Sequence, residues 1–396
     1  MVILLYNKVL NYSYGGFWSL ELVYLDNAAT TKVCPEAAKK ALEMMTEYYG
    51  NPSSLHSLGV QAEQMVGVAR RQVAKLMGCD PENLVFTSGG TEANNLAIFG
   101  AVEARRRDGK HIVTTAVEHS SVAASCKELE RRGYEVTRLV PDSDGTITPG
   151  QVAEACREDT VLVTMMYVNN ENGARFPIDR IISAVRRAAP RALIHCDAVQ
   201  AVGKLPLSAV KMDIDLMTAS AHKIHGPKGC GVLYIKKGVR ILPRLFGGEH
   251  EGGMRAGTEA VSLIAAFGAA ADAVPHLDRQ QSLYLSLRKR LSDGLADIKD
   301  VVWLSPETAV PYIVNISVPG IKSETMLHFL AQRGVYVSSG SACSKGKRSP
   351  VLTALGLPER VIDSALRISF THTNTPDDVD RFLEALKEGA STLMRR

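Results

Sequence analysis

Short, continuous apolar runs alternate with longer amphipathic stretches from about residue 35 to residue 275. Runs such as 161–166, 192–196 and 231–235 have the length and composition of strands that are buried on both faces. The stretches between them have the pattern of helices. Strands separated by helices predict an α/β fold, in which a mostly parallel sheet lies between layers of helices.

Proline and glycine mark the ends of the expected helices, because proline suits the first turn and glycine commonly follows the last. In the first part of the chain we expect helices over 35–50, 57–77, 91–107 and 122–132. After residue 275 the pattern changes to a long helix, 277–297, then short strands, a further helix and a last helix from Pro376. We therefore predict an N-terminal segment, 1–37, that packs with the small domain, a large domain, 38–275, and a small α+β domain, 276–396.

Composition and charge exclude several classes of protein. The 396 residues are 45% hydrophobic and 22% charged, as in ordinary globular proteins, and a net charge of +4 is too small to indicate a nucleic-acid surface. No apolar run reaches the roughly 18 residues of a membrane helix, and no signal peptide pattern is present. The seven cysteines are widely spaced without a Cys-x-x-Cys pair. This spacing argues against disulfides and against a zinc site, and it indicates a reducing compartment. Together with the charge and the apolar runs, it leads us to expect a cytoplasmic protein that binds neither membranes nor nucleic acid directly.

The candidate chemistry gathers where the expected strands end. Lys223 follows the apolar run 214–219 and precedes a Gly-Pro-Lys-Gly turn, so its amine can reach a cleft at the sheet edge. Lysine amines in such positions form Schiff bases with aldehydes, and pyridoxal phosphate is the usual aldehyde in enzymes. Taken alone, a solvated lysine beside a turn is the commoner case. The residues at the other strand ends decide whether Lys223 holds a cofactor or is a solvated surface lysine.

The connection at 87–95 joins a strand to a helix and is rich in glycine. Around Gly90 and Thr91, backbone amides could approach a phosphate at the start of the helix. A plain glycine turn with Thr91 as the helix cap is an equal alternative.

Four polar residues at other strand ends suit a flat cofactor ring. Asp197 ends a buried strand, where a carboxylate must be paired, either with a protonated pyridine nitrogen or as a helix cap. Gln200 is placed to donate to a ring hydroxyl. His119 could stack on the ring and move protons, although a lone histidine is more often structural. Asn170 could hydrogen-bond a cofactor hydroxyl, which by itself is a weak signal.

Two more loops carry candidate residues. Thr258 follows a second glycine-rich loop and could reach a phosphate. Cys343 lies in a glycine-rich loop beside Lys345, Lys347 and Arg348, whose charges would lower the pKa of its thiol and favour the thiolate. The other six cysteines have the apolar or helical surroundings of inert thiols. From its surroundings alone, Cys343 could equally be reactive or inert.

In this order, the segments resemble the cysteine desulfurases of the NifS/IscS type, a branch of the class V, fold-type I pyridoxal phosphate enzymes. The resemblance runs from Tyr24 to about Asp380, and although single motifs are widespread, their combination is specific. The matching motifs are Tyr24-Leu-Asp-Asn-Ala-Ala-Thr-Thr, Gly50-Asn-Pro-Ser-Ser-Leu-His, Phe86-Thr-Ser-Gly-Gly-Thr-Glu-Ala-Asn-Asn, Val117-Glu-His, Val168-Asn-Asn-Glu, His222-Lys-Ile-His-Gly-Pro-Lys-Gly, Arg255-Ala-Gly-Thr and Ser338-Ser-Gly-Ser-Ala-Cys.

The resemblance implies a role for each candidate residue. Lys223 would hold the cofactor and, with His119, move the substrate Cα proton, while Asp197 would pair with the pyridine nitrogen. The other cofactor contacts would be Gly90, Thr91, Ser220 and His222 at the phosphate, Asn170 and Gln200 at the ring hydroxyl, His119 on the ring face, and Thr258 from the partner subunit of a homodimer.

The implied reaction removes sulfur from L-cysteine and gives L-alanine and a persulfide on Cys343. Arg367 would bind the substrate carboxylate through two parallel hydrogen bonds, with help from Asn51. The sulfur would pass to an acceptor protein, either an iron–sulfur scaffold or a tRNA-thiolation enzyme. No resident metal is expected, beyond a transient contact of Cys343 with an iron–sulfur cluster.

Three departures from the family pattern leave alternatives open. The loop after Cys343 is shorter and more basic than expected. Thr371 stands where glycine is commoner in the family, and this residue would alter the substrate end of the pocket. Residues 1–22 match no part of the family pattern. One alternative is another enzyme on the same scaffold, such as a selenocysteine lyase or a class V aminotransferase. The other is a non-catalytic scaffold for sulfur-carrier partners.

Overall fold

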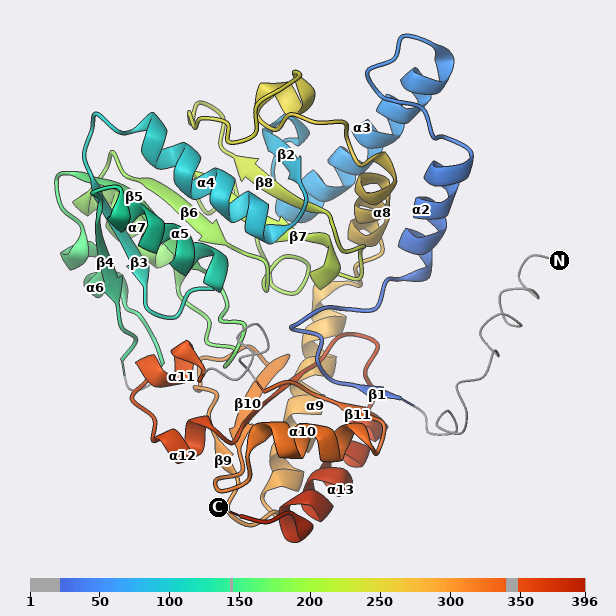
Figure 1. Cartoon of the computed structure of the whole chain (residues 1–396), viewed down its shortest axis with the longest axis vertical. Coiled ribbons are helices and arrows are strands. Elements are labelled where there is room, and N and C mark those ends of the chain that lie inside the picture. Colours follow the sequence, from blue (N-terminus) through green and yellow to red (C-terminus); the bar gives the residue numbers. More distant parts are fainter. Residues whose placement is uncertain (1–21, 143–144, 340–347, 396) are drawn as a thin grey trace.

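The computed structural model describes residues 22–142, 145–339 and 348–395, so Cys343 lies outside the described residues. The chain forms two bodies, drawn one above the other in Figure 1, and the long helix α9 (Leu277–Leu295) runs from the upper body into the lower one.

The upper body is built on a seven-stranded sheet. In spatial order its strands are β2 (Leu84–Thr87), β8 (Gly231–Ile235), β7 (Leu216–Ser220), β6 (Leu193–Asp197), β5 (Thr160–Met166), β3 (His111–Thr115) and β4 (Glu135–Leu139). Strand β8 is antiparallel to both of its neighbours, and the other neighbouring pairs are parallel. The predicted α/β fold with a mostly parallel sheet, of fold-type I, is confirmed.

Helices cover both faces of this sheet, which explains why its strands are apolar throughout. Ile112 and Leu193 pack in one apolar cluster with α4 (Gly90–Ala104) and α5 (Ser120–Arg131). Their neighbours Val113 and Ile194 point to the opposite face and join the larger cluster. The other helices of this body are α2 (Pro35–Thr46), α3 (Ser57–Met77), α6 (Pro149–Ala155), α7 (Ile178–Ala188) and α8 (Val261–Asp272).

The lower body combines a small antiparallel sheet with helices. The sheet has the order β12 (Ala365–Ser369), β10 (Ile313–Ser317) and β9 (Val302–Trp303), and the helices are α10 (Ser323–Ala331), α11 (Pro350–Ala354), α12 (Glu359–Ile362) and α13 (Pro376–Thr392). The N-terminal strand β1 (Val23–Tyr24) pairs in parallel with β11 (Val335–Tyr336) and so lies with this body (Figure 1). The division of the chain into domains stays a prediction.

Helix ends agree with the prediction where glycine adopts a left-handed backbone. Helix α3 ends at Met77, and Gly78 follows with a φ of 63°. Two expected ends are wrong, because α2 stops at Thr46 and α4 at Ala104, before the turns that lead to the next element.

Candidate active site

The carboxyl ends of β3, β5, β6 and β7 meet at one edge of the larger sheet, and candidate residues follow them there. His119 caps the N-terminus of α5, and its Nδ1 accepts from the Ser121 backbone amide at 3.2 Å. Burial lowers the pKa of His119, the charge of Asp197 opposes that shift, and the charge of Lys223 adds to it. The fold therefore gathers these three candidates.

Asp197, at the end of β6, is buried and anchored by two donors. Its Oδ2 accepts from Asn94 Nδ2 at 2.8 Å, and its Oδ1 accepts from the Val199 amide at 3.1 Å. No helix begins at Asp197, so its alternative interpretation as a helix cap is wrong. Asn94 in α4 is a site residue that sequence reasoning missed, although it belongs to the motif that starts at Phe86.

The first turn of α4 suits a phosphate group. Helix α4 begins at Gly90 after Gly89, and no side chain caps its amides, so Thr91 is not the helix cap. A Cβ on Gly90 would lie 3.8 Å from the Ser220 Cβ, which shows how closely this turn approaches β7. The Ser220 Oγ is buried without a hydrogen-bond partner. Uncapped amides beside an unpaired hydroxyl fit a phosphate at a helix N-terminus.

Lys223 is held at the sheet edge by backbone oxygens rather than left in solvent. Its Nζ donates to the carbonyls of Ala28 and Ala29 at 2.6 and 2.7 Å. Next to it, burial and the Lys223 charge lower the pKa of His222 to about 4, so this imidazole is neutral at neutral pH. A half-buried amine in a site with a buried carboxylate can attach an aldehyde cofactor.

Gln200 contacts the same N-terminal segment. Its Nε2 donates to the Ala28 carbonyl at 2.9 Å, and its Oε1 is buried without a partner. The atom left for a ring hydroxyl is therefore an acceptor, and not the donor that the sequence suggested.

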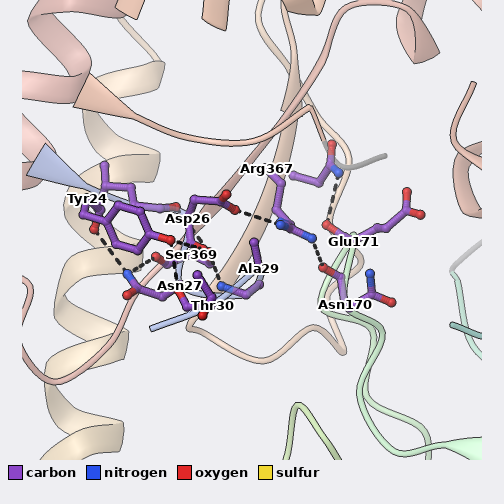
Figure 2. Close-up of polar contacts among 12 residues, drawn as sticks. Tyr24, Asp26, Asn27, Ala29, Thr30, Asn170, Glu171, Arg367 and Ser369 are labelled. Carbon is purple, nitrogen blue, oxygen red and sulfur yellow. Dashed lines mark hydrogen bonds and ion pairs between the residues drawn. The ribbon is translucent and has the colours of Figure 1, made fainter. Parts of the chain in front are cut away.

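Arg367, in β12, is fixed by two contacts that leave its Nε without a partner. Its side chain is 3% exposed, and its Nη2 pairs with Asp26 Oδ1 at 2.8 Å. Its Nη1 donates to the backbone oxygen of Asn170 at 2.8 Å, while its Nε is buried with no partner (Figure 2). A rigid guanidinium with an unpaired donor can accept a substrate carboxylate. Sequence reasoning missed Asp26, which stands in the motif that starts at Tyr24.

Three predicted residues are not joined to this group. Asn51 is exposed between α2 and α3, where its Oδ1 accepts from the Ser53 amide at 3.0 Å, and Thr258 is exposed in the loop before α8. Cys343 lies outside the described residues. The chain enters that segment next to the arginine, because the Ser338 amide donates to the Arg367 carbonyl at 3.1 Å and the Arg367 amide donates back at 2.7 Å.

The fold and these residues agree with the comparisons to known proteins. The Aminotransferase class-V family model matches residues 23–382. A cysteine desulfurase of Nostoc sp. is 43% identical over 374 residues, covering 93% of each chain. The cysteine desulfurase IscS of Methanosarcina thermophila is 41% identical over 370 residues, covering 92% of this chain and 91% of its own. A solved NifS-like protein superposes with a TM-score of 0.89 at 35% identity, covering 94% of this chain and 100% of its own. The chain therefore belongs to the class V aminotransferase family and, within it, is a pyridoxal phosphate-dependent cysteine desulfurase.

Proposed function

We propose that the residues gathered at the sheet edge hold pyridoxal phosphate in this desulfurase. The first turn of α4, Ser220 and His222 would bind the phosphate, and Lys223 would attach the cofactor covalently. His119 would cover the ring, Asp197 would pair with its nitrogen, and Asn170 and Gln200 would contact its hydroxyl. When bound, the cofactor supplies an electron sink for the carbon beside the substrate amine.

The chain's own groups would then bind the substrate and move its protons. Arg367 would hold the substrate carboxylate with its unpaired Nε–H, while Asp26 and the Asn170 backbone keep the guanidinium in place. The Lys223 amine would take the Cα proton. Burial lowers the pKa of His119, so its imidazole is neutral at neutral pH and can share that proton.

The nucleophile that we propose is Cys343, and the observation that carries this assignment concerns the other cysteines. Six of the seven cysteines lie in the described part of the chain, and burial raises the pKa of every one. These thiols stay protonated at neutral pH and are poor nucleophiles. Cys343 lies five residues beyond Ser338, which pairs with the backbone of Arg367.

The sulfur transfer balances without another reagent. The Cys343 thiolate would attack the sulfur of L-cysteine, an S–S bond would form, and the Cβ–S bond would break with its electron pair left on Cβ. Protonation of Cβ and return of a proton from the Lys223 amine to Cα then complete L-alanine. Arg348 contributes less to the thiolate than the sequence suggested, because it is paired with Glu359 of α12 and with Asp363, which follows that helix. Lys345 and Lys347 remain as the cations that would lower the pKa of the thiol.

We further propose a cytoplasmic homodimer that passes its sulfur to an iron–sulfur scaffold or a tRNA-thiolation enzyme. The exposed positions of Thr258 and Asn51 suit residues that complete the site of a second subunit. The IscS name of a relative favours the iron–sulfur acceptor. Among the described helices, none has the length and apolar character to cross a membrane.

An absorbance spectrum before and after addition of L-cysteine, with assays for alanine and sulfide, tests the proposed site. We expect a visible cofactor band that changes on addition, with equimolar alanine and sulfide in the presence of a reductant. A protein that stays colourless after pyridoxal phosphate is supplied would contradict the assignment of the cofactor site.

Substitution of the substrate arginine should separate binding from chemistry. Arg367→Lys keeps a positive charge but loses the planar pair of donors, so we expect kcat/KM for L-cysteine to fall about 100-fold, mostly through KM.

Substitution of the residue that positions this arginine should have a smaller effect. Asp26→Asn keeps an oxygen that accepts from Arg367 Nη2 but loses the negative charge of the carboxylate. We expect it to raise KM about tenfold with kcat nearly unchanged. Steady-state kinetics on both variants checks this, and an effect on kcat alone would contradict it.

A further inference from the structure

A cavity of about 1110 Å³ has Lys223 in its wall. It lies between the N-terminal segment, the turn after β7, the start of α9 and the connection from β12 to α13. Lys223, Lys204, His225 and His372 line it, and we call it the Lys204 cavity. Thr371, one of the departures from the family pattern, also lines it.

Lys204 is a buried cation without a counter-ion. Lys204 is 4% exposed, and no hydrogen bond or ion pair joins its Nζ to any residue of the described chain. The ammonium instead lies over the ring of Tyr312, 5.2 Å from the centroid. Burial lowers the pKa of Lys204 to about 7, and the Lys223 charge adds to this. A cation placed in this way lowers stability unless something pairs with it.

Two histidines extend the unpaired polar surface of the cavity. The rings of His225 and His372 lie 4.5 Å apart. His225 Nδ1 is 2.9 Å from the Lys32 carbonyl and must carry the proton there, because a carbonyl only accepts. Its Nε2 is buried with no partner. The backbone of His225 has a φ of 65°, an unfavourable conformation for a residue with a side chain, and it keeps this ring in the cavity wall.

No carboxylate in the described part of the chain balances these groups. The charges that act on His225 are those of His372 and Lys204, and those that act on His372 are Arg279 and Lys204. The acidic residues of the cavity wall are engaged elsewhere or exposed: Asp378 accepts from the Thr375 amide at the start of α13, and Glu36 and Asp377 face solvent.

We infer that the Lys204 cavity binds a small inorganic oxyanion of the sulfate or phosphate class, with Lys204 and the Nε2 of protonated His225 as its donors. The space is ample, the buried donors lack partners, and the charged groups that act on Lys204, His225 and His372 are all basic. Because Lys223 lines the same cavity, a bound anion also stabilises the protonated form of the Lys223 amine.

Binding should weaken as the pH rises. In the folded protein, the pKa of Lys204 is lowered to about 7 and that of His225 to about 4, and an anion must draw a proton onto whichever group is neutral. Lys223, His222, His372, Arg279 and Tyr312 are other titratable groups that face them. We expect affinity to be higher at about pH 6.5 than at about pH 8.5, with proton uptake on binding.

Isothermal titration of sodium sulfate and sodium phosphate into the full chain loaded with pyridoxal phosphate tests the inference, since the loaded cofactor already fills the phosphate turn of α4. We expect saturable binding that Lys204→Met weakens at least about tenfold. Lys211→Met, at an exposed lysine outside the cavity, should leave the affinity unchanged.

Folding of the variants is checked by thermal melting. Lys204→Met removes an unpaired buried charge, so in buffer without oxyanion it should melt no lower than the natural chain. If it does not fold, His225→Asn, which removes the other proposed donor, replaces it and should weaken binding about threefold. Absence of saturable binding, or unchanged binding in whichever of the two variants folds, would overturn the inference.

Discussion

Lys223→Ala is expected to lower sulfide production from L-cysteine by at least about 10³-fold, because this residue would both attach the cofactor and carry the Cα proton. The fold should survive the change. The lysine amine donates to the backbone oxygens of Ala28 and Ala29, and the Ala28 oxygen keeps Gln200 as a donor in the variant. The purified variant should lose the covalent cofactor band, yet still bind added pyridoxal phosphate at the turn of α4.

Lys228→Ala is the matched control, since Lys228 is an exposed lysine in the turn that follows. This variant should keep the cofactor band and full activity. Absorbance spectra and sulfide assays on both variants test whether Lys223 attaches the cofactor. Full turnover by Lys223→Ala would show that the cofactor is attached elsewhere.

The candidates at strand ends could be predicted because local sequence and sheet geometry determine them together. Lys223, Asp197 and His119 each follow a run that reads as a strand, and the carboxyl ends of neighbouring parallel strands meet at one edge. The expected strands at 161–166 and 231–235 are present with little change. The α/β fold follows from such runs, because a strand buried on both faces needs helices on both sides.

The contacts that hold the candidates in place could not be predicted, because they join distant parts of the chain. Asp26 and Arg367 are 341 positions apart, and nothing near either residue indicates that they pair. Asn94 and Asp197 are 103 positions apart. The unpaired Lys204 was missed for a related reason: its isolation depends on what the fold places around it, and the local sequence shows only a lysine after a glycine.

The start of α4 was also predicted wrongly, because contacts between distant parts of the chain affect where a helix begins. Thr91 is a good cap residue by type, but α4 starts one residue earlier, at Gly90. Gly90 packs against the Val199 side chain, where an added Cβ would lie 3.1 Å from Cγ2, and the local sequence does not indicate this contact.

Cys343→Ala should separate cofactor chemistry from sulfur transfer. We expect the variant to keep the cofactor band and to respond to L-cysteine, because Lys223, Asp197 and Arg367 are unchanged. Production of alanine and sulfide should fall at least about 100-fold, since no other thiol can take the sulfur. Mass spectrometry should find one extra sulfur atom on the natural chain after treatment with L-cysteine, and none on the variant.

Cys156→Ala is the control for this experiment, because burial raises the pKa of the Cys156 thiol to about 11. A protonated thiol does not attack sulfur at neutral pH, so this variant should keep full activity and gain the extra sulfur on Cys343. Undiminished sulfide release by Cys343→Ala would eliminate the persulfide route. It would favour direct release from the substrate, as in an enzyme that uses the same scaffold without a protein thiol.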